Sequence, residues 1–456
     1  MSQEKEKTNK YKEISQKYGD PWIWGVYIML IIISIIESYS ASSREVAQQG
    51  LYMPLIMQCI YLGGGAVLVF LTLRVDYNNT KFLYLMVPVL AIGTVFSLLY
   101  VMKFGAIING ARRAMTIIPG VLTIQPAEFA KLSIVTLLSY IFAKSQKNRD
   151  ISTRGLVWAA LAVAVYGGLM IKSGLTNTLL LIAISGSMLL IGGASYKKIG
   201  VVMLFFGIMF GFFFIIKSHN DKKNEMFNDT QREMRVDMPA GAPGVEIVPS
   251  QGSKGEVART GTWKSRLREW WYSDSLVYRD ITPKNQQEVF SRMAQAHGGI
   301  KGVGVGKSRE CSRLPLAFSD YIFSIIIEET GLLGGLFVLL LYLSLLGRAA
   351  MIVQRSRRVL PSLLVIGMAS FITFQALFHM AINVGVFPVS GQPLPLISKG
   401  GSSIGVISLA FGVMLSVSRT IANYGNKKNK VEESPIIEGL DAANPTAIIP
   451  AKNVWK

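Results

Sequence analysis

Long apolar runs separated by polar segments restrict the fold of this chain more than any other feature. About ten such runs recur, and residues 23–36 are almost wholly aliphatic or aromatic. A helix needs about 20 apolar residues to cross the hydrocarbon core, and its backbone must be hydrogen-bonded within the segment. We therefore expect ten membrane-spanning helices, near residues 21–41, 51–73, 82–102, 126–143, 155–172, 174–193, 199–216, 321–346, 360–384 and 401–423.

The fold class expected is all-α, a ten-transmembrane-helix bundle with a large extracytoplasmic loop between spans seven and eight. Lys and Arg crowd in the two tails and in the loops after spans four, six and eight. Short basic loops face the cytoplasm, so both termini are expected there. The expected parts are a tail at 1–20, spans one to seven at 21–216, the large loop at 217–320, spans eight to ten at 321–423 and a tail at 424–456.

Composition excludes several other classes of protein. Only 16% of the residues are charged, against about 25% in soluble domains. The formal net charge of +19 resembles a nucleic-acid signal, but topology accounts for much of it, so no nucleic-acid partner is expected. Cys59 and Cys311 predict two unpaired thiols. No His, Cys or Asp cluster has metal-ligand spacing. The first apolar run lacks a cleavage site and is expected to remain as a span.

The first polar cluster lies around the start of span four. Arg112 and Arg113 precede the span, either as interfacial anchors or as a clamp for a phosphate, which the planar guanidinium suits. Gln125 and Glu128 enter the span, and Lys131 follows Glu128 by one helical turn. A buried Glu128–Lys131 ion pair would serve structure alone, whereas a functional role would place it in a site.

The second cluster lies at the start of span eight. Asp320, Ser324 and Glu328 are spaced by four and share one helix face, with Glu328 about two turns deeper. A carboxylate at the edge of an apolar region can accept a proton from a substrate. The alternative is that Asp320 caps the helix, with Ser319 competing for that position. Glu329 faces elsewhere and is available to a neighbouring helix.

The third cluster, HGGIKGVGVGKSRE at residues 297–310, resembles a phosphate-binding loop only superficially. Counting back from Gly306, the first glycine of the nucleotide-binding pattern falls on Lys301, so the register fails. A glycine-rich loop that passes close to a ligand or to helix ends remains the expectation, with Lys307 and Ser308 as candidate substrate contacts.

The fourth cluster lies on span nine and in the segment after it. Gln375, His379 and Asn383 repeat every four residues and predict a polar stripe that faces the bundle interior. The stretch rich in Pro and Gly from residue 388 to 401 is expected to re-enter or cap the bundle from outside. Ser324, Glu328 and these three residues are expected to act as structural polar groups.

Together, the motifs resemble the SEDS family (shape, elongation, division and sporulation proteins). The matching segments are NGARR with QPAEFAK, the glycine-rich loop followed by LPLAFSDYIFSIIIEETG, and FPVSGQPLPLISKGGSS, which is more similar to division-type members. The resemblance implies a peptidoglycan glycosyltransferase that polymerises lipid II, with Asp320 as its essential aspartate. The family arginine falls on Arg112 or Arg113, and the usual basic residue of the last loop is missing, with Lys399 as its substitute.

The polar groups lie on the side where no nucleotide supplies energy, so the donor must arrive activated, as a lipid pyrophosphate sugar. We expect Asp320 to act as base, with no organic cofactor and either with or without a divalent cation, Mg²⁺ or Mn²⁺. The implied partners are lipid II, a class B penicillin-binding protein and division regulators, in the bacterial inner membrane. A flippase, an elongation-type polymerase and a division scaffold are the alternatives. The candidate contacts to substrate or pyrophosphate are Arg112, Arg113, Gln125, Glu128, Lys131, Lys307, Ser308, Gln392 and Lys399.

Overall fold

The chain folds as a multi-pass helical membrane protein. The computed structural model describes residues 13–41, 52–75, 77, 80–108, 111–118, 122–147, 150–171, 174–202, 204, 207, 281, 285–314, 317–356, 358–388 and 390–432. Within these ranges, eight helices have the length and composition to cross a membrane. They are α2 (Pro21–Ser40), α4 (Met53–Leu73), α5 (Thr80–Phe104), α6 (Pro126–Ser145), α7 (Thr153–Ile171), α12 (Ile322–Arg355), α13 (Val359–Asn383) and α14 (Gly401–Glu432).

A shorter apolar helix, α8 (Leu175–Ile191), matches the sixth predicted span. The seventh predicted span, 199–216, lies mostly outside the described residues, as do both tail ends and most of the predicted large loop, including the tryptophan-rich segment 263–272. The part of the loop that is described contains the amphipathic helix α11 (Gln286–Gly298). The predicted all-α architecture is therefore confirmed, while the count of ten spans stays a prediction.

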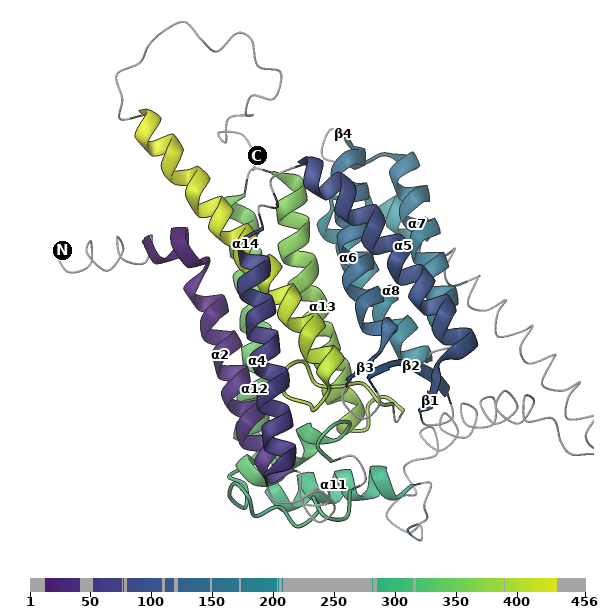
Figure 1. Cartoon of the computed structure of the whole chain (residues 1–456), viewed down its shortest axis with the longest axis vertical. Coiled ribbons are helices and arrows are strands. Elements are labelled where there is room, and N and C mark those ends of the chain that lie inside the picture. Colours follow the sequence, from purple (N-terminus) through teal and green to yellow (C-terminus); the bar gives the residue numbers. More distant parts are fainter. Residues whose placement is uncertain are drawn as a thin grey trace, which may run out of the picture.

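The helices form two groups with α13 between them (Figure 1). One group contains α2, α4, α12 and α14, and the other contains α5, α6, α7 and α8. Helix α13 packs against α6 and α8 on one side and against α12 and α14 on the other. Side chains on the outer faces of α4 and α5 are apolar and exposed, for example Phe70 and Phe96, as expected of surfaces that meet lipid.

The described ends of the chain lie together at one end of the bundle. The Asp20 carboxylate caps α2 through the Trp22 N–H at 2.9 Å and pairs with Arg348 of α12 at 2.7 Å. The Asp20 N–H donates to the hydroxyl of Ser418 on α14 at 2.9 Å. Helix α11 lies at the opposite end, which we call the α11 end (Figure 1).

A small antiparallel sheet at the α11 end was not predicted (Figure 1). It contains β1 (Ala106–Ile108), β2 (Ala111–Ile118) and β3 (Leu122–Ile124), in the order β1-β2-β3, with Ile107 opposite Arg112. Pairing within the connection between α5 and α6 satisfies backbone groups locally. A second, two-stranded pair joins β4 (Gln146–Lys147) to β5 (Asp150–Ile151) between α6 and α7.

Helix α12 changes direction at Gly331, whose φ of 77° lies in the left-handed region. Residues 322–329, before the bend, are all buried, whereas Leu332 and Leu333 after it are about 60% exposed. The lipid-facing part of α12 therefore begins after the bend. Span eight was expected near residues 321–346, and the structure adds a bend within it, with residues 322–329 in a buried segment before Gly331.

Candidate functional site

Asp320 lies just before α12 at the α11 end and is partly exposed. The Ser319 hydroxyl donates to Asp320 Oδ1 at 3.1 Å. Gly391 lies against the other carboxylate oxygen, since a Cβ built on Gly391 would be 3.1 Å from Asp320 Oδ2. A partly exposed carboxylate held by a neighbouring hydroxyl is available to a substrate that approaches from this end.

The interpretation of Asp320 as a helix cap was wrong. The N-cap of α12 is Tyr321, whose side chain makes no cap hydrogen bond. Instead, the N–H and hydroxyl of Ser324 both donate to Asn383 Oδ1, at 3.3 and 2.9 Å. An oxygen of α13 thus accepts hydrogen bonds from the first turn of α12.

The polar stripe predicted on α13 exists, and its residues Gln375, His379 and Asn383 are all buried. His379 Nδ1 lies 2.6 Å from the Gln392 carbonyl, which only accepts, so Nδ1 carries a proton. Asn383 Nδ2 donates to the His379 carbonyl at 2.9 Å and lies 3.3 Å from His379 Nε2. Two residues of the stripe, Gln375 and His379, donate hydrogen bonds to the loop between α13 and α14.

That loop, residues 390–399, is held by side chains from three helices. His379 and Gln375 donate to the Gln392 and Pro393 carbonyls, at 2.6 and 3.2 Å. Tyr342 of α12 donates to the Pro395 carbonyl at 2.6 Å. Ser34 of α2 donates to the Ile397 carbonyl at 3.3 Å. The stretch was expected to re-enter or cap the bundle, and Leu394, Leu396 and Ile397 are buried between these helices.

Sequence reasoning missed Ser34 and Tyr342. Each is a single polar side chain within an apolar run, and a polar group in a span usually has a partner. It also missed Asn177 of α8, whose Oδ1 accepts a 2.9 Å hydrogen bond from Gln392 Nε2. A polar residue within each apolar run was the available signal, although its partner could not be read from sequence.

The predicted Glu128–Lys131 ion pair is present inside the bundle. Lys131 Nζ lies 2.7 Å from Glu128 Oε1 and donates to Gln375 Oε1 at 2.8 Å. Lys131 has no exposed surface and Glu128 almost none. Gln125 is the N-cap residue of α6 and is partly exposed. In this conformation the pair ties α6 to α13, and its charges do not reach the surface.

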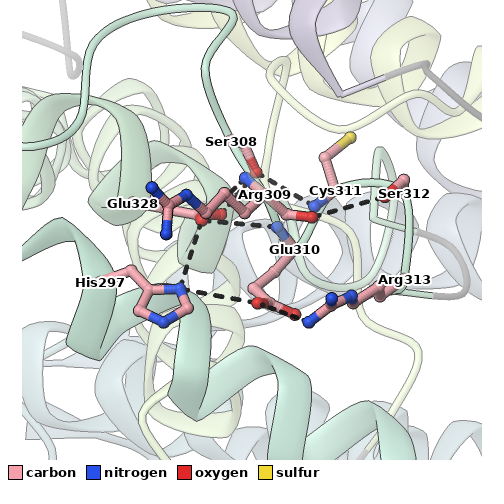
Figure 2. A network of polar contacts seen from close by, with 8 residues as sticks. All are labelled: His297, Ser308, Arg309, Glu310, Cys311, Ser312, Arg313 and Glu328. Atoms are coloured by element: carbon pink, nitrogen blue, oxygen red, sulfur yellow. Dashed lines mark hydrogen bonds and ion pairs between the residues drawn. The ribbon is translucent and has the colours of Figure 1, made fainter.

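The glycine-rich loop contacts Glu328 of α12 (Figure 2), and it also contacts Glu329. Glu328 accepts from the Ser308 hydroxyl at 2.5 Å and from the Arg309 N–H at 3.0 Å. Glu329 accepts from the Ser40 hydroxyl of α2 and from main-chain groups of the same loop. The loop donors point at carboxylates of this chain, so the expectation of a loop that passes close to helix ends is confirmed.

The Glu310 carboxylate, next to the Glu328 cluster, makes two further contacts (Figure 2). Glu310 Oε1 lies 3.6 Å from His297 Nδ1 and 3.4 Å from the guanidinium of Arg313. Lys307 is exposed, whereas the Ser308 hydroxyl is already bonded to Glu328. Among the described residues, no group of three or more His, Cys, Asp or Glu side chains is placed to hold a metal ion.

The family model described as "Cell cycle protein" (FtsW/RodA/SpoVE) matches residues 21–241 and 259–423. This chain belongs to the FtsW/RodA/SpoVE family. A "Probable peptidoglycan glycosyltransferase FtsW" of Lactococcus lactis subsp. lactis is 26% identical, with 86% of this chain and 90% of that protein covered. The "Stage V sporulation protein E" of Bacillus subtilis is also 26% identical, over 86% and 95%.

A solved structure reported as "Structural coordination of polymerization and crosslinking by a peptidoglycan synthase complex" has the same fold. Its TM-score is 0.60 at 21% identity, with 87% of this chain and 98% of that chain covered. The two proteins thus share a fold over most of this chain.

In this FtsW/RodA/SpoVE chain, the structure brings part of the predicted site together. Asp320 touches Gly391, and the loop that contains Gly391 also contains Gln392 and Lys399. Lys399 Nζ lies 5.3 Å from the centre of the Phe318 ring, close in sequence to Asp320. Gln375 links the same loop to the ion pair, so these groups form one connected region.

Other predicted residues lie apart from that region or are only partly described. Arg112 and Arg113 lie on β2 at the α11 end, and their side chains fall outside the described part of the structure. Glu328 lies on α12 roughly 9 Å further along the helix from its first residue, in the cluster with Ser308. The role of Arg112 and Arg113 toward a substrate stays a prediction, and Glu328 was expected to be a structural polar group.

Proposed function

We propose that the chain is a peptidoglycan glycosyltransferase that polymerises lipid II into glycan strands for septal cell-wall synthesis. Membership of the FtsW/RodA/SpoVE family and the similarity to proteins named peptidoglycan glycosyltransferase FtsW support this activity. The single structural observation that carries the assignment is a partly exposed Asp320 carboxylate, set at the end of the bundle against a rigid buried loop.

Asp320 acts as the general base in this proposal. Its carboxylate accepts the proton of an acceptor sugar hydroxyl as that oxygen attacks the anomeric carbon of the donor. The bond from the anomeric carbon to the lipid pyrophosphate breaks, and the pyrophosphate leaves with its electron pair. The Ser319 hydroxyl, which donates to Asp320 Oδ1 at 3.1 Å, holds the carboxylate while Oδ2 faces Gly391.

Cationic groups on the same end of the bundle are proposed to stabilise the leaving pyrophosphate. The candidates are Arg112 and Arg113 on β2, Lys307 on the glycine-rich loop and Lys399 beside Phe318. Guanidinium and ammonium groups neutralise charge that develops on phosphate oxygens. Lys131 is buried and bonded in this conformation, so we assign it to α6–α13 packing, with access to substrate only after a rearrangement.

A divalent cation, Mg²⁺ or Mn²⁺, is tested as a separate variable. Around Asp320 the described residues supply one carboxylate and one neighbouring hydroxyl, and Mg²⁺ usually takes one or two carboxylates from protein, with waters and substrate phosphates as its other ligands. A bound cation would neutralise charge on the leaving pyrophosphate, and the assay with and without Mg²⁺ or Mn²⁺ tests this.

The location and partners follow from the same proposal. The α11 end faces outward and the ends of the chain face the cytoplasm, in the bacterial inner membrane. The similarity to a component of a peptidoglycan synthase complex supports a partner that cross-links the product, which we propose to be a class B penicillin-binding protein, together with division regulators. The bound lipid is proposed to be lipid II.

The test is polymer formation from purified lipid II by the full chain with its transpeptidase partner, with and without Mg²⁺ or Mn²⁺. Asp320→Ala and Asp320→Asn should lower the rate by about a hundredfold to ten-thousandfold. Asp150→Asn, in the connection between α6 and α7, is the matched control and should retain the wild-type rate. Undiminished polymer from Asp320→Ala would contradict the proposal, and lipid transfer across vesicles without polymer would favour a flippase.

A further inference from the structure

We propose that Ser398 is a positioning residue for Asp320, which it holds through the main chain rather than through the carboxylate. The inference rests on the proposed function, because Asp320 matters here as the base of that reaction. Ser398 is buried in the loop at residues 390–399 and does not belong to α12 or to the segment that contains Asp320.

Three consecutive main-chain carbonyls leading into α12 accept hydrogen bonds from α13 and the loop after it. The Phe318 carbonyl accepts from the Lys399 N–H at 3.1 Å. The Ser319 carbonyl accepts from the Ser398 hydroxyl at 2.7 Å. The Asp320 carbonyl accepts from Asn383 Nδ2 at 3.1 Å. Donors that take three successive carbonyls fix the position and rotation of this short segment, including the Cα of Asp320.

The Ser398 hydroxyl links the loop at residues 390–399 to residues 318–320, and it acts as the donor of that link. Its oxygen accepts from the Leu394 N–H at 2.8 Å, so its hydrogen is available for the Ser319 carbonyl. Ser398 is only 1% exposed, and an unpaired carbonyl left there would pay a desolvation cost. The hydrogen bond from Ser398 is the shortest of the three, and replacing this one side chain removes it.

The loop that supplies these donors is itself rigid. Side chains of α2, α12 and α13 take four of its carbonyls, as described above. Leu396, at the centre of the loop, has a φ of 63°, which non-glycine residues adopt only when their surroundings hold them there. The helices thus fix the loop, the loop fixes residues 318–320, and Asp320 is placed against Gly391.

Loss of the Ser398 hydroxyl should affect the chemical step more than substrate binding. Displacement of a catalytic group by about 1 Å can cost about a hundredfold in rate. In contrast, no lipid-binding group is removed, because the Ser398 hydroxyl contacts only main-chain atoms in this structure. A lower kcat with an unchanged KM for lipid II is the expected signature.

The experiment compares Ser398→Ala with Ser416→Ala in the full chain with its transpeptidase partner. Ser416 is an equally buried serine on α14, and its hydroxyl donates to the Val75 carbonyl at 2.5 Å, at the other end of the bundle. Both variants remove one buried hydroxyl that donates to a main-chain carbonyl, and Ser398→Ala also removes the acceptor of the Leu394 N–H. Ser398→Ala should lower kcat by about tenfold to a hundredfold with KM within about twofold, and Ser416→Ala should match wild type.

Two further measurements separate positioning from loss of structure. Ser398→Thr keeps a hydroxyl and should recover most of the lost kcat. Deuterium uptake by a peptide that covers residues 317–323 should rise in Ser398→Ala and stay at the wild-type level in Ser416→Ala, a difference that does not depend on turnover.

The outcomes are distinguishable. If Asp320→Ala is inactive while Ser398→Ala has wild-type kcat and unchanged deuterium uptake at 317–323, the positioning role is wrong and the proposed function stands. If Ser416→Ala loses as much kcat as Ser398→Ala, the loss reflects general destabilisation and the inference is overturned. If Asp320→Ala retains polymerisation, the assignment of the base fails and the positioning role fails with it.

Discussion

Lys131 on α6 donates a 2.8 Å hydrogen bond to the amide oxygen of Gln375 on α13, 244 residues further along the chain. The same ammonium pairs with Glu128 at 2.7 Å and lies 5.6 Å from the centre of the Phe371 ring. Gln375 also binds the loop after α13, because its Nε2 donates to the Pro393 carbonyl. A buried ion pair is thereby joined to the loop that lies against Asp320.

Removal of one member of this ion pair should destabilise the bundle. Lys131→Met leaves the Glu128 carboxylate buried without its cation, and we expect a loss of about 3–5 kcal/mol in the free energy of unfolding. The double variant Glu128→Gln/Lys131→Met removes both charges and should recover most of that loss. Unfolding by SDS titration in mixed micelles measures both. A double variant as unstable as Lys131→Met would show that the charge left behind is not the cause.

The close approach of Gly391 to Asp320 predicts a steric effect on activity. A Cβ at residue 391 would lie 3.1 Å from Asp320 Oδ2, so Gly391→Ala should displace the carboxylate and lower kcat by about tenfold with little change in stability. Gly400→Ala, in the segment just before α14, meets only an ordinary contact of 3.7 Å with Ser403 and serves as the control. Equal rates for the two variants in the polymerisation assay would refute this steric argument.

The bend in α12 predicts a large difference between two glycines of one helix. Gly331 has a φ of 77°, and a Cβ there would lie 2.2 Å from the Ile300 carbonyl oxygen. Gly331→Ala should therefore cost about 1–3 kcal/mol from the backbone conformation alone, with the clash in addition. Gly347→Ala, where a Cβ meets open space, should be neutral or stabilising. Thermal unfolding in detergent measures the stability of both variants. A Gly331→Ala variant as stable as Gly347→Ala would contradict the prediction.

The pair at the connection between α6 and α7 predicts a pH-dependent contribution. A hydrogen bond from Lys198 Nζ, at 2.6 Å, lowers the pKa of Asp150 below its usual value. Because the pKa is lower in the folded state, the pair stabilises the fold above the unfolded pKa of about 3.9 and is lost as the pH falls through the folded pKa. Wild type should therefore unfold at a slightly higher temperature than Asp150→Asn at pH 7, and the two should converge in acid. If the difference in unfolding temperature between the two proteins persists in acid, the Asp150–Lys198 pair is not its cause.

Local sequence patterns determined the elements of the bundle. The length of each apolar run predicted where the described spans lie, because a span must bury its own backbone hydrogen bonds in lipid. Spacings of three and four residues predicted the Glu128–Lys131 pair and the α13 stripe correctly, because both depend only on helix geometry. The order of motifs was also sufficient for the family resemblance, which the match over residues 21–241 and 259–423 confirms.

Only the tertiary structure decided which of these elements meet. The sequence alone could not show that Asn383 accepts hydrogen bonds from the first turn of α12, that α12 bends at Gly331, or that the glycine-rich loop contacts Glu328 and Glu329. Nor could it show that the Ser398 hydroxyl donates to the carbonyl of Ser319, the residue before Asp320. Such contacts join residues far apart in the chain, and they depend on how neighbouring helices pack. Helix periodicity determines the face that a side chain occupies, whereas packing determines the partner on that face.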